Sequence, residues 1–193
     1  MKKTSRIFKS INYWLIGIVS LVILLSYSHA FPITLVRVGF IDLDEIISRY
    51  TVKYIETQIS VRERYVNQLT EEYNRRYFIL NPDERRNLQI KIQDHKNVLD
   101  TFIYNLSYFK SNETVQDSLI KQIIQRDIMR AIQKTSELEG FHLILDNTGN
   151  FIYGSEDINL TEKVLFRLED RLLNMQSGAY VPKVPLIYEL EEY

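Results

Sequence analysis

The feature that most constrains the fold is a helical pattern over residues 43–80, which contains neither Pro nor Gly. Apolar side chains recur at steps of four and three residues, and they fill six of eight positions on one line: Ile55, Ile59, Arg62, Val66, Leu69, Tyr73, Arg76 and Leu80. So narrow a line is typical of a coiled-coil seam rather than of the broad buried face of a globular helix. The pattern predicts a long helix that packs along one partner helix.

The motif NPDE, residues 81–84, ends this helix and predicts the start of a second one. Pro82 disfavours helical backbone in the residue before it, but it fits the first turn of a helix that Asn81 caps. The chain therefore reverses direction here. We expect an antiparallel helical hairpin, an arm over residues 43–139 with its tip near residues 80–84.

The second helical pattern runs over residues 82–139 and shows a similar seam at Leu88, Ile92, His95, Leu99, Phe102, Leu106 and Phe109. Its phase changes near residues 111–112, which indicates a stutter or a local break. At about 1.5 Å per residue, helices of 38 and 58 residues are roughly 55 and 85 Å long. The surplus length of the second helix either runs past the first or contains the break.

Short β-rich stretches flank the predicted arm. Apolar residues alternate with Arg37 and Gly39 before Asp42, which predicts a half-buried strand followed by a helix start. The stretches FHLILD and FIY, residues 141–146 and 151–153, predict two more strands around the turn at residues 147–150.

A small head domain follows from these strands, because antiparallel helices bring both ends of the arm together. We expect residues 31–42 and 140–174 to form it, including a last helix from Asn159 to about Asn174. Open strand edges must be paired or covered, and symmetric association would do so. The fold class is therefore α+β, a helical arm on a head that oligomerises through Val36, Val38, Phe40, Leu143, Leu145, Phe151 and Tyr153.

The two ends of the chain differ from this pattern. Four basic residues precede an uncharged apolar run and then Ser28-His29-Ala30, the layout of a secretory signal peptide. We expect removal of residues 1–30 and location in the periplasm; the alternative is an uncleaved anchor with the same orientation. Residues 175–193, which contain Gly178 and an acidic run, predict a loosely ordered tail.

Composition excludes several kinds of site. The chain has no Cys, so it has no disulfide, thiolate metal site or cysteine nucleophile. Residues 31–193 carry 20 Lys and Arg against 25 Asp and Glu, which argues against nucleic acid as a partner.

Catalytic and metal-binding motifs are also missing. His95 and His142 have no second ligand at helical spacing, and the turn DNTGN lacks the ligand spacing of a calcium loop. No phosphate-binding loop or nucleophile motif is present. We expect neither an enzyme nor a cofactor.

Four stretches together resemble the OmpH/Skp family of periplasmic chaperones. They are the signal peptide, VGFIDLDEII (38–47), LNPDERRNLQIKI (80–92) and EGFHLILDNTGNFIYGSEDINLTEKVLFRL (139–168). The resemblance implies a homotrimer in which pooled β-strands form the body and three arms enclose a cavity. It also implies an ATP-independent holdase, which keeps unfolded outer-membrane proteins from aggregating. Unlike well-studied members, this chain is acidic beyond residue 30.

The candidate client-binding residues lie on the predicted arm and combine aromatic with basic side chains. Tyrosine offers broad apolar contact at low entropic cost, which suits weak contacts with an unfolded β-rich client. The candidates are Arg75, Arg76, Tyr77, Phe78, Arg85, Arg86, Tyr104 and Tyr108. The basic tip also suits an anionic membrane surface. The alternative function is a coiled-coil adaptor of the cell envelope.

Overall fold

A computed structural model describes residues 36–147, 156–178 and 180–191. The chain divides into two units, residues 1–36 and residues 37–193, and the elements below all belong to the second. In order they are β1 (Val38–Ile41), α2 (Leu43–Arg76), α3 (Pro82–Asn112), α4 (Ser118–Glu139), β2 (Leu143–Asp146), the 3-10 turn η1 (Glu156–Ile158), α5 (Thr161–Gln176) and α6 (Ile187–Glu191). The predicted signal segment, Phe151 and Tyr153 lie outside the described residues.

Side-chain caps set the ends of the two longest helices. The Asp42 carboxylate accepts the Glu45 N–H at 2.8 Å and starts α2. At the start of α3, the Asn81 side chain accepts the Glu84 N–H at 2.8 Å, while the Glu84 carboxylate accepts the Asn81 N–H at 3.0 Å. This reciprocal capping box satisfies two N–H groups that have no partner inside the helix. It fixes the chain reversal where the sequence predicts it.

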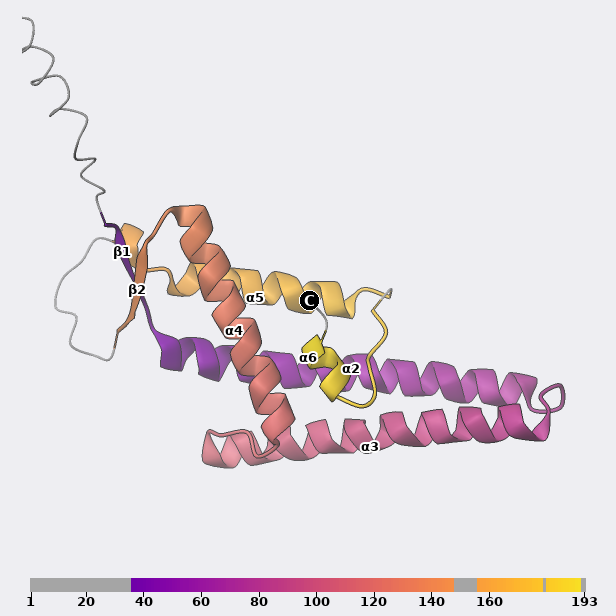
Figure 1. Cartoon of the computed structure of the whole chain (residues 1–193). Coiled ribbons are helices and arrows are strands. Elements are labelled where there is room, and N and C mark those ends of the chain that lie inside the picture. Colours follow the sequence, from indigo (N-terminus) through magenta and orange to yellow (C-terminus); the bar gives the residue numbers. More distant parts are fainter. Residues whose placement is uncertain (1–35, 148–155, 179, 192–193) are drawn as a thin grey trace, which may run out of the picture. The chain divides into compact units, whose positions relative to one another are not determined.

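Helices α2 and α3 lie side by side and run in opposite directions (Figure 1). As residue numbers rise along α2, the numbers of the contacting residues on α3 fall. Tyr54 contacts Phe102, Tyr65 contacts His95, and Tyr73 accepts a hydrogen bond from Gln89. The buried residues of both helices include the following predicted seam positions: Ile55, Arg62, Val66, Leu69, His95, Phe102 and Phe109.

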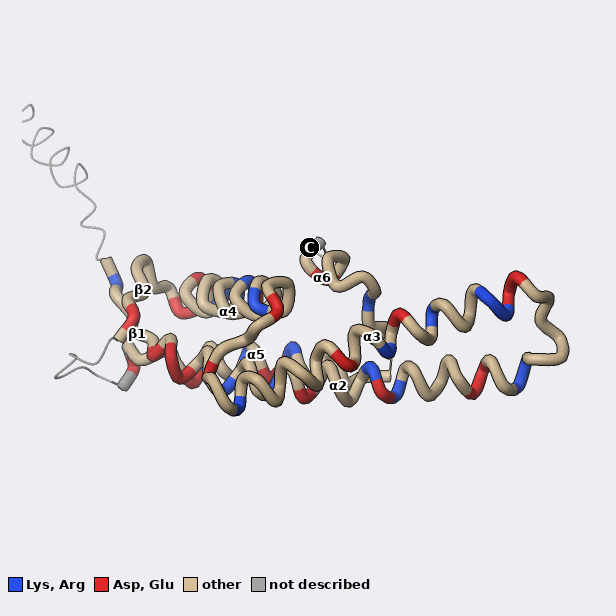
Figure 2. The backbone as a smooth tube through the Cα atoms, turned by 90° about the horizontal axis from the view of Figure 1, so that it is seen from below, with Lys and Arg blue, Asp and Glu red and all other residues tan. Residues whose placement is uncertain are grey.

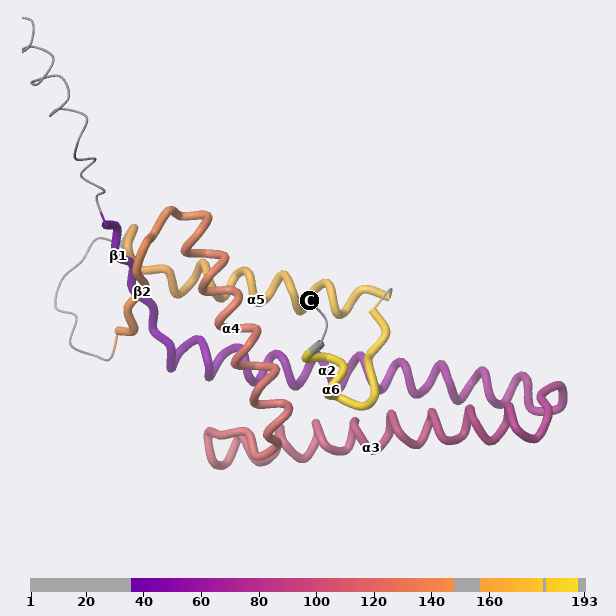
Figure 3. The backbone as a smooth tube through the Cα atoms, viewed as in Figure 1, coloured from indigo at the N-terminus to yellow at the C-terminus, as the bar shows by residue number. Residues whose placement is uncertain are grey.

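The second helical pattern is interrupted, and α3 ends at Asn112 rather than continuing to residue 139. Glu113 adopts a left-handed conformation with φ 53°. The buried Asn105 side chain accepts the N–H groups of Gln116 and Asp117 at 3.0 and 2.9 Å, so the bend has its own hydrogen-bonded support. Helix α4 then departs from α3 and packs against α5 and α2 (Figure 3). The predicted arm over residues 43–139 is thus shorter in the structure, because α4 leaves the α2–α3 pair.

The sheet has two described strands, β1 and β2, which are parallel with Val38 opposite Leu143 and Phe40 opposite Leu145. Gly39 is buried, and a Cβ there would come within 2.9 to 3.1 Å of three core side chains. Only glycine lets β1 approach so closely. The inner face joins a core formed mainly by α2, α4 and α5, which includes Ile41, Ile46, Ile120, Ile123, Ile128, Phe141, Leu160, Val164 and Leu168.

The described part of the C-terminal tail is packed, unlike the loosely ordered tail that the sequence predicts. Pro182, Leu186 and Glu189 are buried. Helix α6 contacts α4, and Leu186 joins the core. The acidic residues suggested a solvated end, but Glu189 has a buried cationic partner on α2.

Candidate functional site

The connection between α2 and α3 exposes large apolar side chains. Phe78 is 94% exposed and Ile79 is 81% exposed, and both follow the end of α2 directly. Tyr77 makes edge contacts with Tyr73 and Phe78, with ring centroids 5.6 and 5.3 Å apart. We call these four residues the tip cluster. Adjacent exposed apolar residues of this size typically mark an interaction site.

Charges around the tip cluster are balanced within residues 71–86, whereas the basic tip that the sequence suggested also counted Lys91 and Lys96 further along α3. The Arg76 guanidinium pairs with Glu72 at 2.6 Å, and the Arg85 guanidinium lies 5.0 Å from the centre of the Tyr77 ring. Figure 2 shows basic and acidic residues mixed towards this end of α2 and α3. The four predicted arginines are matched by four acidic residues nearby, so the set comprises Arg75, Arg76, Arg85, Arg86, Glu71, Glu72, Asp83 and Glu84.

The other two candidate client-binding residues lie elsewhere on α3. Tyr104 is exposed, Tyr108 is half-buried, and their rings stack at 6.2 Å. Tyr104 is about 28 Å and Tyr108 about 34 Å along the helix from Arg85. The structure therefore brings six candidates together at the tip and places these two tyrosines apart from them.

A second apolar surface lies on the sheet. Leu143 and Leu145 are 47% and 41% exposed, and their cross-strand partners Val38 and Phe40 are half-buried. Residues two apart in a strand share one face, so these four side chains form what we call the outer sheet face. Val36, the remaining described candidate for oligomerisation, is exposed.

A buried carboxylate joins α2, α4 and α5. Both oxygens of Asp127 on α4 are engaged: Oδ2 accepts the Tyr50 hydroxyl at 3.0 Å and pairs with Arg171 at 3.0 Å, and Oδ1 pairs with Arg126. Burial raises the pKa of Tyr50 well above its usual value, and the Asp127 charge adds to this. Tyr50 therefore stays a donor, and the cluster ties α2, α4 and α5 together.

A second buried ion pair involves the tail. Arg62 is 0% exposed and its guanidinium pairs at 2.5 Å with Glu189, which is 5% exposed. Sequence reasoning placed Arg62 in the seam but found no partner for it. The available signal was the charge itself, because a charged side chain that is buried in a seam is costly unless it is paired.

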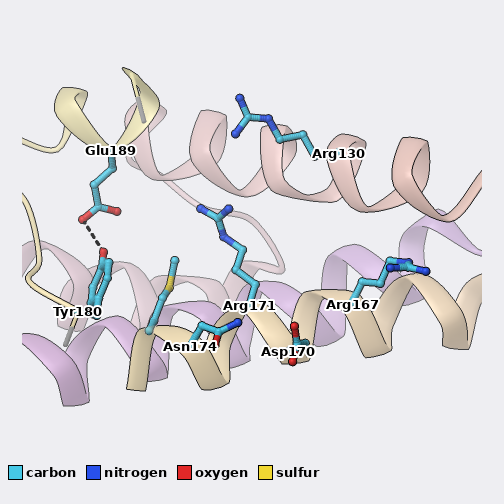
Figure 4. Close-up of a pocket in the computed structure, with 8 residues that line it drawn as sticks. Arg130, Arg167, Asp170, Arg171, Asn174, Tyr180 and Glu189 are labelled. Atoms are coloured by element: carbon cyan, nitrogen blue, oxygen red, sulfur yellow. Dashed lines mark hydrogen bonds between the residues drawn. The ribbon is translucent and has the colours of Figure 1, made fainter. Parts of the chain in front are cut away.

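An open cavity of about 830 Å³ lies beside these ion pairs, between α4, α5 and the tail (Figure 4). Its walls carry mixed charge, and the residues are Arg130, Arg167, Asp170, Arg171, Asn174, Met175, Tyr180 and Glu189. Arg167 donates to the Thr135 hydroxyl at 3.0 Å, and Arg171 pairs with Asp127. Two of the arginines in the wall thus serve the packing of the helices.

His95 is buried between α2 and α3 and packs edge-on against Tyr65 at 4.8 Å. Burial, together with the charges of Arg62 and Lys91, lowers the pKa of His95 to about 4. The imidazole is therefore neutral at neutral pH. Nowhere in the described part of the chain do three His, Asp or Glu side chains gather as metal ligands would.

Comparisons with known proteins assign the chain to a family. No helix within residues 36–147, 156–178 and 180–191 has the length and apolar character needed to cross a membrane. None of the curated proteins matches the chain. The family model described as outer membrane protein (OmpH-like) matches residues 37–168, which is more than half of the sequence. The chain therefore belongs to the OmpH-like family, whose members are periplasmic chaperones of outer-membrane proteins rather than enzymes.

Proposed function

We propose that this chain is an ATP-independent holdase, which binds unfolded outer-membrane proteins in a cavity between the helical arms of a homotrimer. The observation that carries the proposal is the tip cluster, where Phe78 and Ile79 project from the end of two packed helices. A holdase needs apolar contacts that are already exposed before the client arrives. The α2–α3 pair supplies them without unfolding.

The surface along the pair suits clients whose strands alternate apolar and polar residues. Tyr104 and Tyr108 present rings with hydroxyl groups that tolerate water. Many weak contacts of this kind hold a client without selecting one sequence. The balanced charge of the tip favours apolar contact with a client over electrostatic attraction to an anionic membrane.

Assembly through the outer sheet face would place three arms around one space. Leu143 and Leu145 expose apolar surface on a small sheet that a monomer leaves open to water. Replacing Leu145 with Asp would bury a charge at the subunit contact. We expect light scattering to show a trimer for the unchanged chain and a monomer for Leu145→Asp; a trimer in both would exclude this surface.

Export to the periplasm would follow from the first thirty residues, which act as a cleaved signal peptide in this proposal. The seams of α2 and α3 would then form the coiled-coil part of each arm. The intact mass of protein purified from cells tests the cleavage, because the mature chain should begin at Phe31. A retained N-terminus would instead support a membrane-tethered adaptor.

Dilution of a urea-unfolded β-barrel protein into buffer tests the holdase activity. We expect the chain, at about one trimer per client, to suppress the rise in turbidity without added nucleotide. Unchanged turbidity at tenfold excess of the trimer would overturn the proposal. An unrelated helical protein at the same mass concentration controls for crowding.

A further inference from the structure

Residues 180–191 lie beyond the family match, yet the structure gives them a defined place against α2 and α4. Tyr180 is partly buried, Leu186 is buried, and the short helix α6 carries Glu189 inward. Figure 3 shows this segment returning from the end of α5 to α2. The segment thus packs against the helices rather than extending from the surface.

Several hydrogen-bond donors surround the Glu189 carboxylate. Arg62 pairs with Oε1 at 2.5 Å, and the Tyr180 hydroxyl donates to the same oxygen at 3.3 Å. The Tyr54 hydroxyl lies 3.4 Å from Oε2. Burial and the Glu189 charge raise the pKa of Tyr180 to about 12 and that of Tyr54 well above its usual value. Both phenols therefore keep the protons that they donate.

Main-chain atoms of the segment are bound as well. Arg62 on α2 donates to the Lys183 carbonyl at 3.2 Å, and Arg126 on α4 donates to the Glu189 carbonyl at 2.5 Å. Two different helices therefore contact the backbone of one short stretch. Side-chain and backbone contacts together are how a groove recognises a peptide.

Arg62 contacts both the α2–α3 pair and the tail: its Nε donates to Gln58 on α2 at 3.2 Å, and its terminal nitrogens reach Glu189 and Lys183. It is fully buried, and its guanidinium lies 5.2 Å from the centre of the Phe102 ring on α3. A buried guanidinium without a carboxylate is strongly unfavourable. The Glu189 carboxylate supplies the charge that offsets the burial of this guanidinium.

From these contacts we infer that α2 and α4 form a peptide-binding groove for short acidic and apolar segments, and that residues 180–191 are its resident ligand. Glu189 is the recognised residue, and Leu186 is the apolar anchor. The inference is independent of the proposed holdase function, since neither the tip cluster nor the outer sheet face contributes to it. Tyr180 and Glu189 also wall the cavity in Figure 4, so the occupant shapes that space.

Hydrogen exchange of the full chain tests the role of Glu189. In Glu189→Gln, we expect the amides of residues 180–191 to exchange at least tenfold faster than in the unchanged chain, because the charge that pairs with Arg62 is lost. Glu162→Gln is the matched control, since Glu162 forms an exposed pair with Arg49. Equal exchange in all three chains would overturn the inference.

A second measurement separates binding from folding. A protease site inserted after the exposed Gly178, around which a side chain would meet open space, lets the full chain fold before it is cut. We expect the cut tail to stay bound through gel filtration, and an added peptide of residues 178–193 to replace it. A peptide with Gln in place of Glu189 should replace it at least ten times less effectively. A tail that dissociates on cutting, or two peptides of equal strength, would show that no such groove exists.

Discussion

The base of the α2–α3 pair, around Tyr50 to Arg62, and its tip place opposite kinds of side chain in opposite surroundings. At the base, Arg62 on α2 and Asp127 on the neighbouring helix α4 are buried and paired. At the tip, apolar Phe78 and Ile79 are exposed. Buried ion pairs specify one arrangement of neighbouring elements, whereas exposed apolar groups gain free energy only when a partner covers them. The base thus fixes the position of the pair, and the tip remains available for binding.

Asp127→Ala should have the largest effect on stability. Arg126, Arg171 and the Tyr50 hydroxyl would lose their shared partner in a buried site. We expect a loss of about 3 kcal/mol in the free energy of unfolding, measured by urea denaturation. Asp100→Ala, at an exposed position on α3, should change it by less than about 0.5 kcal/mol. Similar losses in both variants would remove the distinction between base and surface.

His95→Leu tests the middle of the pair through pH. The pKa of His95 is about 4 in the folded chain and 6.5 in the unfolded chain, so only the unfolded chain takes up this proton between those values. Above pH 6.5 this difference costs the folded chain no stability. As pH falls towards 4, protonation of the unfolded chain progressively lowers the free energy of unfolding. We expect acidification to cost on the order of 2 kcal/mol less in His95→Leu than in the unchanged chain. Equal slopes of stability against pH would contradict the buried neutral imidazole.

Asn81→Ala should have a smaller effect, because it removes one cap near the tip. The Glu84 N–H would lose its acceptor at the start of α3. We expect a loss of about 1 kcal/mol by urea denaturation, with faster amide exchange in the first turn of α3. A loss as large as that of Asp127→Ala would mean that the tip contributes as much to folding as the base.

The double substitution Phe78→Ser and Ile79→Ser should change stability least and client binding most. Both side chains are exposed, so the free energy of unfolding should shift by no more than about 0.5 kcal/mol. We expect that several times more of the double variant than of the unchanged chain is needed to suppress client aggregation, measured by turbidity. Exposed Ile103→Ser on α3 is the control for general loss of apolar surface. Full activity in the double variant would move the binding site away from the tip cluster.

Local rules predicted the features that depend on neighbouring residues. Asp42 and Asn81 begin helices in the structure as their capping patterns indicate. Spacing alone found the seam residues, of which all but Arg76 are buried or half-buried. Each of these depends on residues within two turns of one another, where the pattern determines the geometry.

Features that depend on distant residues were not predictable in the same way. The phase change near residues 111–112 indicated a disturbance, but the direction of α4 depends on its packing with α5, which comes later in the chain. The tail was misjudged because Glu189 has its partner 127 residues earlier. The tip was predicted to be basic from a set that extended to Lys91 and Lys96 and left out Glu71 and Glu72; over residues 71–86 alone the charges balance.

The pairing of β1 with β2 also determines the order in which this chain can fold. The two strands are more than a hundred residues apart in sequence, with three helices between them. Contacts between α2 and α3 close a short connection, whereas the sheet closes a long loop and carries a larger entropic cost. During synthesis β1 is made first, and its partner strand follows only after more than a hundred further residues. We therefore expect the α2–α3 pair to form before the two strands pair.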